Sequence, residues 1–122
     1  MRIPSLLLTK LYVKGSLCNE GEGFQFTVKN VLSPGTAIKF LALDVDGREY
    51  PPEEVFLLVN GIKRIEAVQV SSQAPFSIGL GRQVTIKVRG GRLSAGPHEV
   101  ELSLLTREVG ALKVPLRDTI DG

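Results

Sequence analysis

The sequence predicts an all-β fold: a two-sheet antiparallel β-sandwich, immunoglobulin-like or jelly-roll-like, with seven to nine short strands. Apolar and polar residues alternate in several segments, the period-two pattern of strands with one face on a core and one in water. Turn signals recur at intervals of roughly 8–12 residues, as in sandwich domains. No segment shows a convincing helical period, and two sheets packed on each other bury their apolar faces without helices.

The N-terminal third predicts three strands. Leu6–Val13 has apolar residues on both faces, which predicts cover on both faces or contact with a partner. Gly15–Gly23 is an expected loop, and Gly23–Asn30 alternates clearly. Thr36–Val45 shifts its inward-facing set near Phe40-Leu41, and such a slip predicts a β-bulge at that point.

Turn residues organise the rest of the chain. Asp46-Gly47 and Asn60-Gly61 predict tight hairpin turns, because these residues tolerate positive φ. Pro51-Pro52 predicts a crossing between the sheets, since proline is excluded from central strands. Ser71–Gly81 is an expected loop, and Asp118–Gly122 an expected polar tail. The later expected strands are Arg48–Tyr50, Val55–Val59, Ile62–Val70, Arg82–Arg89, Leu93–Leu105 and the stretch around Leu112, Val114 and Leu116.

The inward-facing positions of these strands predict one shared core. Its expected members are Phe24, Phe26, Val28, Leu43, Val84, Ile86, Val100, Leu102, Leu104 and Val114. Glu99 and Glu101 are expected on the solvent face of their strand.

Length and composition set the class of protein. The 122 residues suit a single domain covering residues 1–122, and 43% hydrophobic with 23% charged residues is ordinary globular composition. A net charge of +2 is too small to imply nucleic-acid binding. The single cysteine, Cys18, rules out an internal disulfide and a thiolate metal cluster, and fits a reducing compartment.

The sequence also predicts a location and a kind of source. The N-terminus lacks the apolar segment and cleavage site of a signal peptide, and no stretch is long enough to span a bilayer. We therefore expect a cytoplasmic protein without membrane contact. Asn, Gln, Cys and Met are scarce, which points toward a thermophilic source.

No polar residue completes a catalytic or metal-binding pattern. His98, the only histidine, follows a Gly-Pro turn and is expected to be an exposed strand-start residue, without the nucleophile that a general base would serve. Asp44 and Asp46 resemble part of a calcium loop that lacks its other ligands. Cys18 has no histidine near it in sequence. We expect no catalytic residue, no metal and no cofactor.

Basic residues give no nucleic-acid signal either. Lys87, Arg89 and Arg92 form a basic strip with Arg82, but the strip lacks interleaved aromatic residues for base stacking. A solvated strand face explains it, and we expect no nucleic-acid partner.

Apolar residues outside the strands predict association with another protein, because monomers rarely leave large apolar patches exposed. The loop Ala74–Leu80 and the two-sided segment at Leu6–Val13 are the candidates. The expected interface residues are Ala74, Pro75, Phe76, Ile78, Leu80, Leu6, Leu8 and Tyr12. A second interpretation of the loop is equally open: it folds back and closes one end of the core.

Several segments together resemble the small β subunit of the C-glycoside deglycosidases and related short proteins of archaea and bacteria. They are Gly23-Phe24-Gln25-Phe26 with Val28, Val45-Asp46-Gly47-Arg48-Glu49, Pro51 or Pro52 before Glu53-Glu54-Val55, and Leu93–Gly96 with His98, Val100 and Leu102. They follow one another in that order across most of residues 12–105. The chain looks short beside that family, which often carries a longer insert between Val59 and Gln83.

The resemblance implies a β-sandwich that binds a larger, barrel-shaped catalytic subunit holding the metal. It therefore implies a non-catalytic accessory subunit whose partner is a larger catalytic protein. The alternative is a sandwich that self-associates as a homo-oligomer or binds a ligand such as carbohydrate. The chain has no Trp and only Tyr12 and Tyr50, which disfavours a sugar platform. A small enzyme is disfavoured by the isolated His98.

Overall fold

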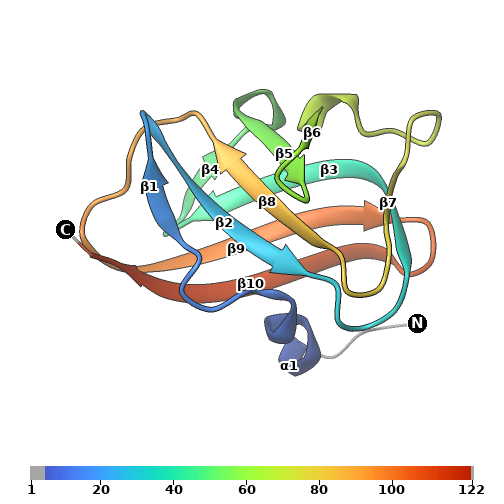
Figure 1. Cartoon of the computed structure of the whole chain (residues 1–122), viewed down its shortest axis with the longest axis horizontal. Coiled ribbons are helices and arrows are strands. Elements are labelled where there is room, and N and C mark those ends of the chain that lie inside the picture. The colour runs from blue at the N-terminus through green and yellow to red at the C-terminus, as the bar shows by residue number, and fades with distance from the viewer. Residues whose placement is uncertain (1–4, 122) are drawn as a thin grey trace.

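The alternating segments form two antiparallel sheets that pack face to face as a β-sandwich, in the computed structural model of residues 5–121 (Figure 1). In sheet A the strand order is β1 (Cys18–Glu20), β2 (Gly23–Lys29), β8 (Gln83–Val88), β5 (Val55–Val59) and β6 (Lys63–Glu66). In sheet B the order is β10 (Gly110–Ile120), β9 (Gly96–Thr106), β3 (Gly35–Val45) and β4 (Arg48–Tyr50), and β7 (Phe76–Ile78) pairs with the start of β3.

The described residues thus contain ten strands rather than seven to nine. The excess comes from two three-residue strands inside segments expected to be loops. β1 pairs with β2, and β7 pairs with Gly35–Ala37 of β3. Each is too short to show a period-two pattern of its own, so partner strands rather than local sequence define them.

The turn and bulge predictions are confirmed. Asp46 and Gly47 have φ of 53° and 88°, and Asn60 and Gly61 have 53° and 70°, as tight hairpin turns of this type require. The pairing of β3 with β9 shifts between Phe40 and Ala42. The chain crosses from sheet B to sheet A through Pro51 and the 3-10 helix η2 (Pro52–Glu54).

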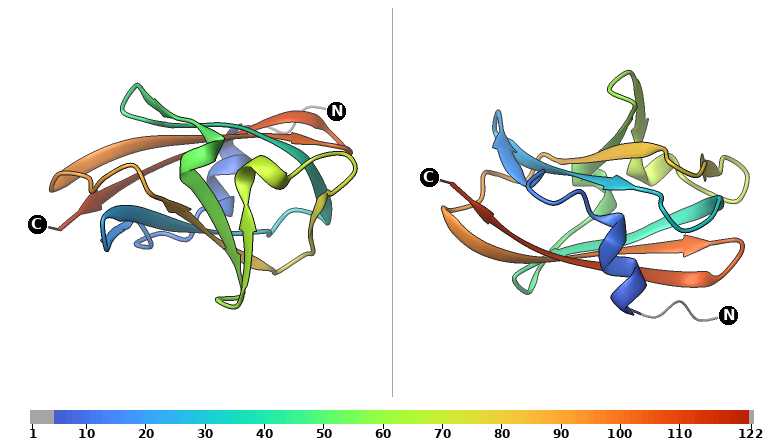
Figure 2. Two further views of the ribbon diagram at one scale, coloured as in Figure 1. Left: turned by 90° about the horizontal axis from the view of Figure 1, so that it is seen from above. Right: turned by 60° about the horizontal axis from the view of Figure 1, so that its bottom comes forward.

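The predicted core lies between the sheets. Eight of its ten expected members are buried, and Val28 and Leu104 are half-buried and pack against the others. The largest fully buried side chains include Phe24 and Phe26, with exposures of 1% and 0%. The long sides of the sandwich are closed by the N-terminal segment along β10 and by η2 with the 3-10 helix η3 (Ala67–Gln69) along β3 and β5 (Figure 2).

The prediction of a first strand over Leu6–Val13 is wrong. Residues Ser5–Leu8 form the short helix α1 and Thr9–Leu11 the 3-10 helix η1; Tyr12 makes only an isolated bridge to Val28. Leucine is a strong helix former and is not β-branched, so the run Leu6-Leu7-Leu8 has no local preference for a strand. The segment packs against β10 and buries Leu8, while Leu6 and Leu7 stay exposed.

The prediction of a polar tail after residue 117 is wrong as well. β10 continues to Ile120, which pairs with Gly96 and is buried. Asp118, in this part of the strand, accepts hydrogen bonds from the Tyr12 hydroxyl and from the backbone N–H of Gly15. This long-range contact with the N-terminal segment therefore holds the end of β10, residues 118–120, in sheet B.

The two ends of the sandwich differ. At the packed end, which includes Phe24, Tyr50 and Val88, the Phe24 and Tyr50 rings meet edge-on with centroids 5.3 Å apart. The backbones of β2 and β8 approach each other so closely there that a Cβ on Gly23 would lie 1.8 Å from the Val88 carbonyl oxygen. At the open end, which includes Val28, Ala37 and Leu104, two apolar cavities remain between the sheets.

Candidate functional site

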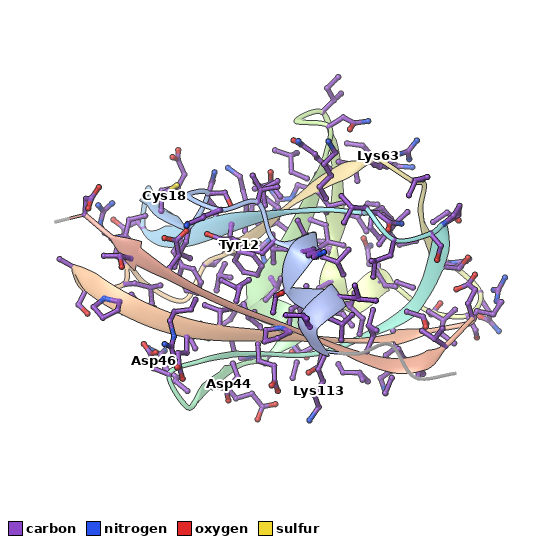
Figure 3. All side chains as sticks on the ribbon, turned by 90° about the horizontal axis from the view of Figure 1, so that it is seen from below. Tyr12, Cys18, Asp44, Asp46, Lys63 and Lys113 are labelled. Carbon is purple, nitrogen blue, oxygen red and sulfur yellow. The ribbon has the colours of Figure 1, made fainter. Side chains whose placement is uncertain are left out.

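Ionisable side chains do not assemble a metal site in the described part of the chain. Among residues 5–121, no three His, Cys, Asp or Glu side chains come close enough to hold a metal ion. In the same residues, no helix has the length and apolar character needed to cross a membrane. Asp44, Asp46 and Lys113 lie on one side of the molecule, and Cys18 and Lys63 lie on the other (Figure 3).

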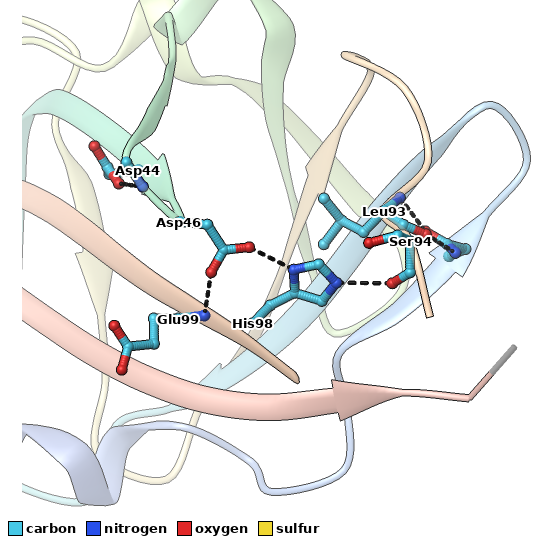
Figure 4. A network of polar contacts seen from close by, with 8 residues as sticks. Asp44, Asp46, Leu93, Ser94, His98 and Glu99 are labelled. Carbon is cyan, nitrogen blue, oxygen red and sulfur yellow. Dashed lines mark hydrogen bonds and ion pairs between the residues drawn. The ribbon is translucent and has the colours of Figure 1, made fainter. Parts of the chain in front are cut away.

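Over the described residues 5–121, His98 is the one charged or strongly polar side chain that is buried, with an exposure of 7%. Its Nδ1 lies 2.5 Å from Oδ2 of Asp46, and its Nε2 lies 2.7 Å from the backbone oxygen of Ser94 (Figure 4). The other carboxylate oxygen of Asp46 accepts a hydrogen bond of 2.8 Å from the backbone N–H of Glu99. The prediction that His98 is an exposed turn residue is therefore wrong.

Both ring nitrogens of His98 face oxygen acceptors, so the doubly protonated imidazolium satisfies both contacts. The Ser94 carbonyl and the Asp46 carboxylate raise the pKa of His98 above its usual value. The Glu99 N–H and the imidazolium lower the pKa of Asp46. Ser94 contributes only its carbonyl, so the group has no side-chain nucleophile. These hydrogen bonds between Asp46, His98 and Ser94 hold the β3–β4 turn to β9 and to the loop before it, and we call them the His98–Asp46 brace.

Tyr12 and Asp118 form a second brace along the side of the sandwich. The Tyr12 hydroxyl donates to Oδ2 of Asp118 at 2.6 Å and accepts from the Leu17 N–H at 2.9 Å. Burial and the bond to Asp118 raise the pKa of Tyr12, while the bonds from Tyr12 and the Thr119 N–H lower the pKa of Asp118. This network ties the N-terminal segment to β10.

An apolar cavity of about 110 Å³ opens between the sheets at the open end. We call it the open-end slot. Its walls include Val28, Ala37, Ile78, Leu102, Leu104 and Leu112. Ala37 and Leu102 are buried and lie at the bottom, whereas Lys29 and Glu108 are exposed and mark the mouth. Half-buried Val28 and Leu104 thus line a cavity rather than completing the core.

Three exposed apolar side chains surround this end of sheet A. Val31, Ile62 and Leu80 are 45%, 86% and 63% exposed, and we call them the apolar rim. Their loops are joined by backbone hydrogen bonds: Gly81 donates to Asn30 at 2.6 Å and Asn60 donates to Gln83 at 3.5 Å. Sequence reasoning singled out only Leu80, because Val31 and Ile62 follow strand ends and become neighbours only in the sheet.

The residues predicted for an interface are spread over different environments. Leu80, Ala74, Pro75 and Leu6 are exposed. Phe76 and Leu8 are buried, and Ile78 and Tyr12 are half-buried. Phe76 therefore fits the core-cap interpretation of the loop, Ile78 lines the open-end slot, and Leu80 reaches solvent. Their role in binding a partner stays a prediction.

The basic strip has an aromatic neighbour that the linear sequence does not reveal. The guanidinium groups of Arg64 and Arg89 lie 3.9 and 4.7 Å from the centroid of the Phe56 ring, and both pair with Glu66. Because the guanidinium groups of Arg64 and Arg89 lie over the Phe56 ring and Glu66 neutralises part of their charge, the ring is occupied by contacts within the domain. Arg92 donates to the backbone of Gly21 instead of joining the group.

The fold and these sites define a β-sandwich domain in which the polar groups around His98 and Tyr12 hold loops to strands, and in which an apolar cavity opens at one end. The chain belongs to the family described as the N-terminal domain of hydroxymethylglutaryl-CoA reductase, whose sequence profile matches residues 7–121. No curated protein matches the chain. The family match overturns the resemblance to the C-glycoside deglycosidase β subunit, and with it the accessory-subunit role in such an enzyme. The segments behind that resemblance are strands and turns common to many sandwiches.

Proposed function

We propose that this chain is a non-catalytic domain of a hydroxymethylglutaryl-CoA reductase and that it docks on the catalytic part of that enzyme. The apolar rim is the observation that carries the proposal. Val31, Ile62 and Leu80 are solvent-exposed at one end of sheet A, where Gly81 donates a hydrogen bond to Asn30 and Asn60 donates one to Gln83 at the start of β8. Large apolar side chains exposed at one end of a sheet favour an interaction site, and the charged residues Lys29 and Arg82 supply the polar edge typical of an interface.

The polar groups support a non-catalytic role. His98 uses both ring nitrogens to hold loops, and Tyr12 and Asp118 hold the N-terminal segment. Each brace would have to be broken before its groups could serve as general acid or base, because catalysis needs a free, aligned proton site. The reaction is thus assigned to the catalytic part of the reductase.

The test is binding of the purified chain to the catalytic part of the reductase from the same organism, by size-exclusion chromatography and isothermal titration calorimetry. We expect a 1:1 complex that Leu80→Asp weakens by about fivefold or more, as truncation of an interface anchor does. Val68→Asp is the control, because Val68 is 52% exposed in η3, beyond the opposite end of β5.

Three outcomes would contradict the proposal. They are absence of a complex, equal weakening by Leu80→Asp and Val68→Asp, and turnover of hydroxymethylglutaryl-CoA by the chain alone. If the chain alone forms a dimer that Leu80→Asp dissociates, the rim serves self-association instead.

A further inference from the structure

The open-end slot is deep for the surface of a small domain. Behind its floor lies a second cavity of about 30 Å³, lined by apolar residues alone. The two cavities share Val28, Ala37, Ile78, Leu102 and Leu104 as walls. Protein interiors are normally packed with few voids larger than a water molecule. An apolar path therefore runs from the mouth, past half-buried side chains, toward the middle of the core.

The shape of this path favours a slender small molecule over the side chains of a protein partner. A protein partner covers apolar side chains that project outward, as those of the rim do. The slot instead runs between the two sheets, with its floor at buried Ala37 and Leu102. A water molecule would be poorly stabilised at this floor, because a buried water needs two to four polar partners and the floor provides none.

The mouth constrains the polar end of such a molecule. Lys29 and Glu108 are both exposed there and carry opposite charges. The Glu108 carboxylate accepts a hydrogen bond of 2.8 Å from the Thr36 N–H, which fixes it beside the opening. With one charge of each sign, the mouth favours neither an anionic nor a cationic head group.

We propose that the open-end slot binds an uncharged amphiphile whose hydrocarbon part has about six carbons, since the slot of about 110 Å³ and the cavity of about 30 Å³ behind it together approach the roughly 150 Å³ of an apolar cavity that accommodates benzene. The hydrocarbon lies between Val28 of sheet A and Leu104 of sheet B, and the polar end stays in water beside Glu108. This site does not depend on the proposed docking function, because its walls are distinct from the three side chains of the apolar rim.

The test is titration of the whole chain with 1-butanol, 1-hexanol and 1-octanol, followed by the methyl NMR signals of Val28, Leu104 and Leu112. Each methylene buried should tighten binding about fourfold, so 1-hexanol should bind roughly fifteenfold more tightly than 1-butanol. The gain should stop near six carbons, because the slot has a floor. Continued gain of the same size through 1-octanol would show partition onto exposed apolar surface and would overturn the proposal.

Variants locate the bound molecule. Ala37→Leu fills the floor and Leu112→Phe narrows the wall, and each should abolish the saturable shifts produced by 1-hexanol. Leu112→Phe keeps the test decisive if Ala37→Leu does not fold. Leu41→Phe is the control, since Leu41 is 36% exposed and does not line the slot. Unchanged 1-hexanol binding in the folded filling variants, or no saturation in the wild-type chain, would also overturn the proposal.

Discussion

The packed end and the open end of the sandwich are built from the same strands, yet they differ in how completely the sheets meet. Along β2, Phe24 near one end is 1% exposed and touches Tyr50, whereas Val28 near the other end is half-buried beside a cavity. At the same end, the His98–Asp46 brace holds the β3–β4 turn to β9 within sheet B. The difference teaches that tight packing between the sheets is confined to one end, whereas apolar space remains between them at the other.

Truncating a core side chain should show the largest contrast. Phe24→Ala should lower the free energy of unfolding by about 3–5 kcal/mol, because it removes a fully buried ring at the packed end. Leu104→Ala should cost less than about 2 kcal/mol, since Leu104 is half-buried and already borders a void. Urea unfolding of both variants measures the contrast. Equal losses would mean that the two ends are equally packed.

Adding one methyl group should show the next largest contrast. Gly23→Ala would place Cβ 1.8 Å from a backbone oxygen that cannot rotate away, so we expect a loss of about 1–3 kcal/mol from forced backbone shifts. Gly79→Ala is the matched control beside the open end, where the new Cβ meets nothing within 4 Å and φ is not positive. Its stability should stay within about 0.5 kcal/mol of wild type.

Thermal melting of the two glycine variants measures this difference. A Gly23→Ala protein that melts with the wild type would show that the close approach at the packed end relaxes freely. A destabilised Gly79→Ala protein would show that the loop before Leu80 is more tightly held than its open surroundings indicate.

Features determined by local sequence were predictable, and features determined by distant contacts were not. The alternation in Gly23–Asn30, the Asn60-Gly61 turn and the bulge after Phe40 are encoded within a few residues, and the structure contains all three. The sequence does not reveal the helix at Ser5–Leu8, because its apolar run of three leucines fits a helix or a strand equally well.

Burial of His98 escaped prediction for a different reason. Its partner Asp46 is 52 residues away, and only the pairing of β3 with β9 brings the two side chains together. A Gly-Pro turn before His98 suggests exposure when it is considered alone. The clue within the sequence was Asp46 itself, since a carboxylate in a tight turn can accept bonds from whichever strand lies beside it.

The open-end slot could not have been predicted from the pattern either. Val28 and Leu104 have the same alternation as the fully buried positions before them, so periodicity assigned them to the core. Whether an inward-facing side chain meets one from the other sheet depends on the twist of the sheets and on the loops after Lys29 and before Gly110, which no strand pattern records.

The smallest expected effect is on how stability depends on pH. It distinguishes the packed end, which contains the titratable His98–Asp46 pair, from the open end. The pKa of His98 is raised by the Ser94 carbonyl and by Asp46, so protonated His98 stabilises the folded chain. This contribution is fully present below the ordinary value of 6.5 and is lost as pH rises through the higher folded-state pKa. The pKa of Asp46 is lowered, so its contribution is present above 3.8 and is lost as pH falls through the folded-state value.

Both contributions are therefore present between about pH 4 and 6.5. Asp46 is 46% exposed on its side chain, so solvent screening limits the pair to about 1 kcal/mol. The melting temperature should fall slightly from pH 6 to pH 9 in the wild-type chain. Asp46→Asn should reduce this slope and leave the part that the Ser94 carbonyl supplies, whereas Leu112→Phe at the open end should retain the full slope. A slope unchanged in Asp46→Asn would show that Asp46 does not contribute to the pH dependence.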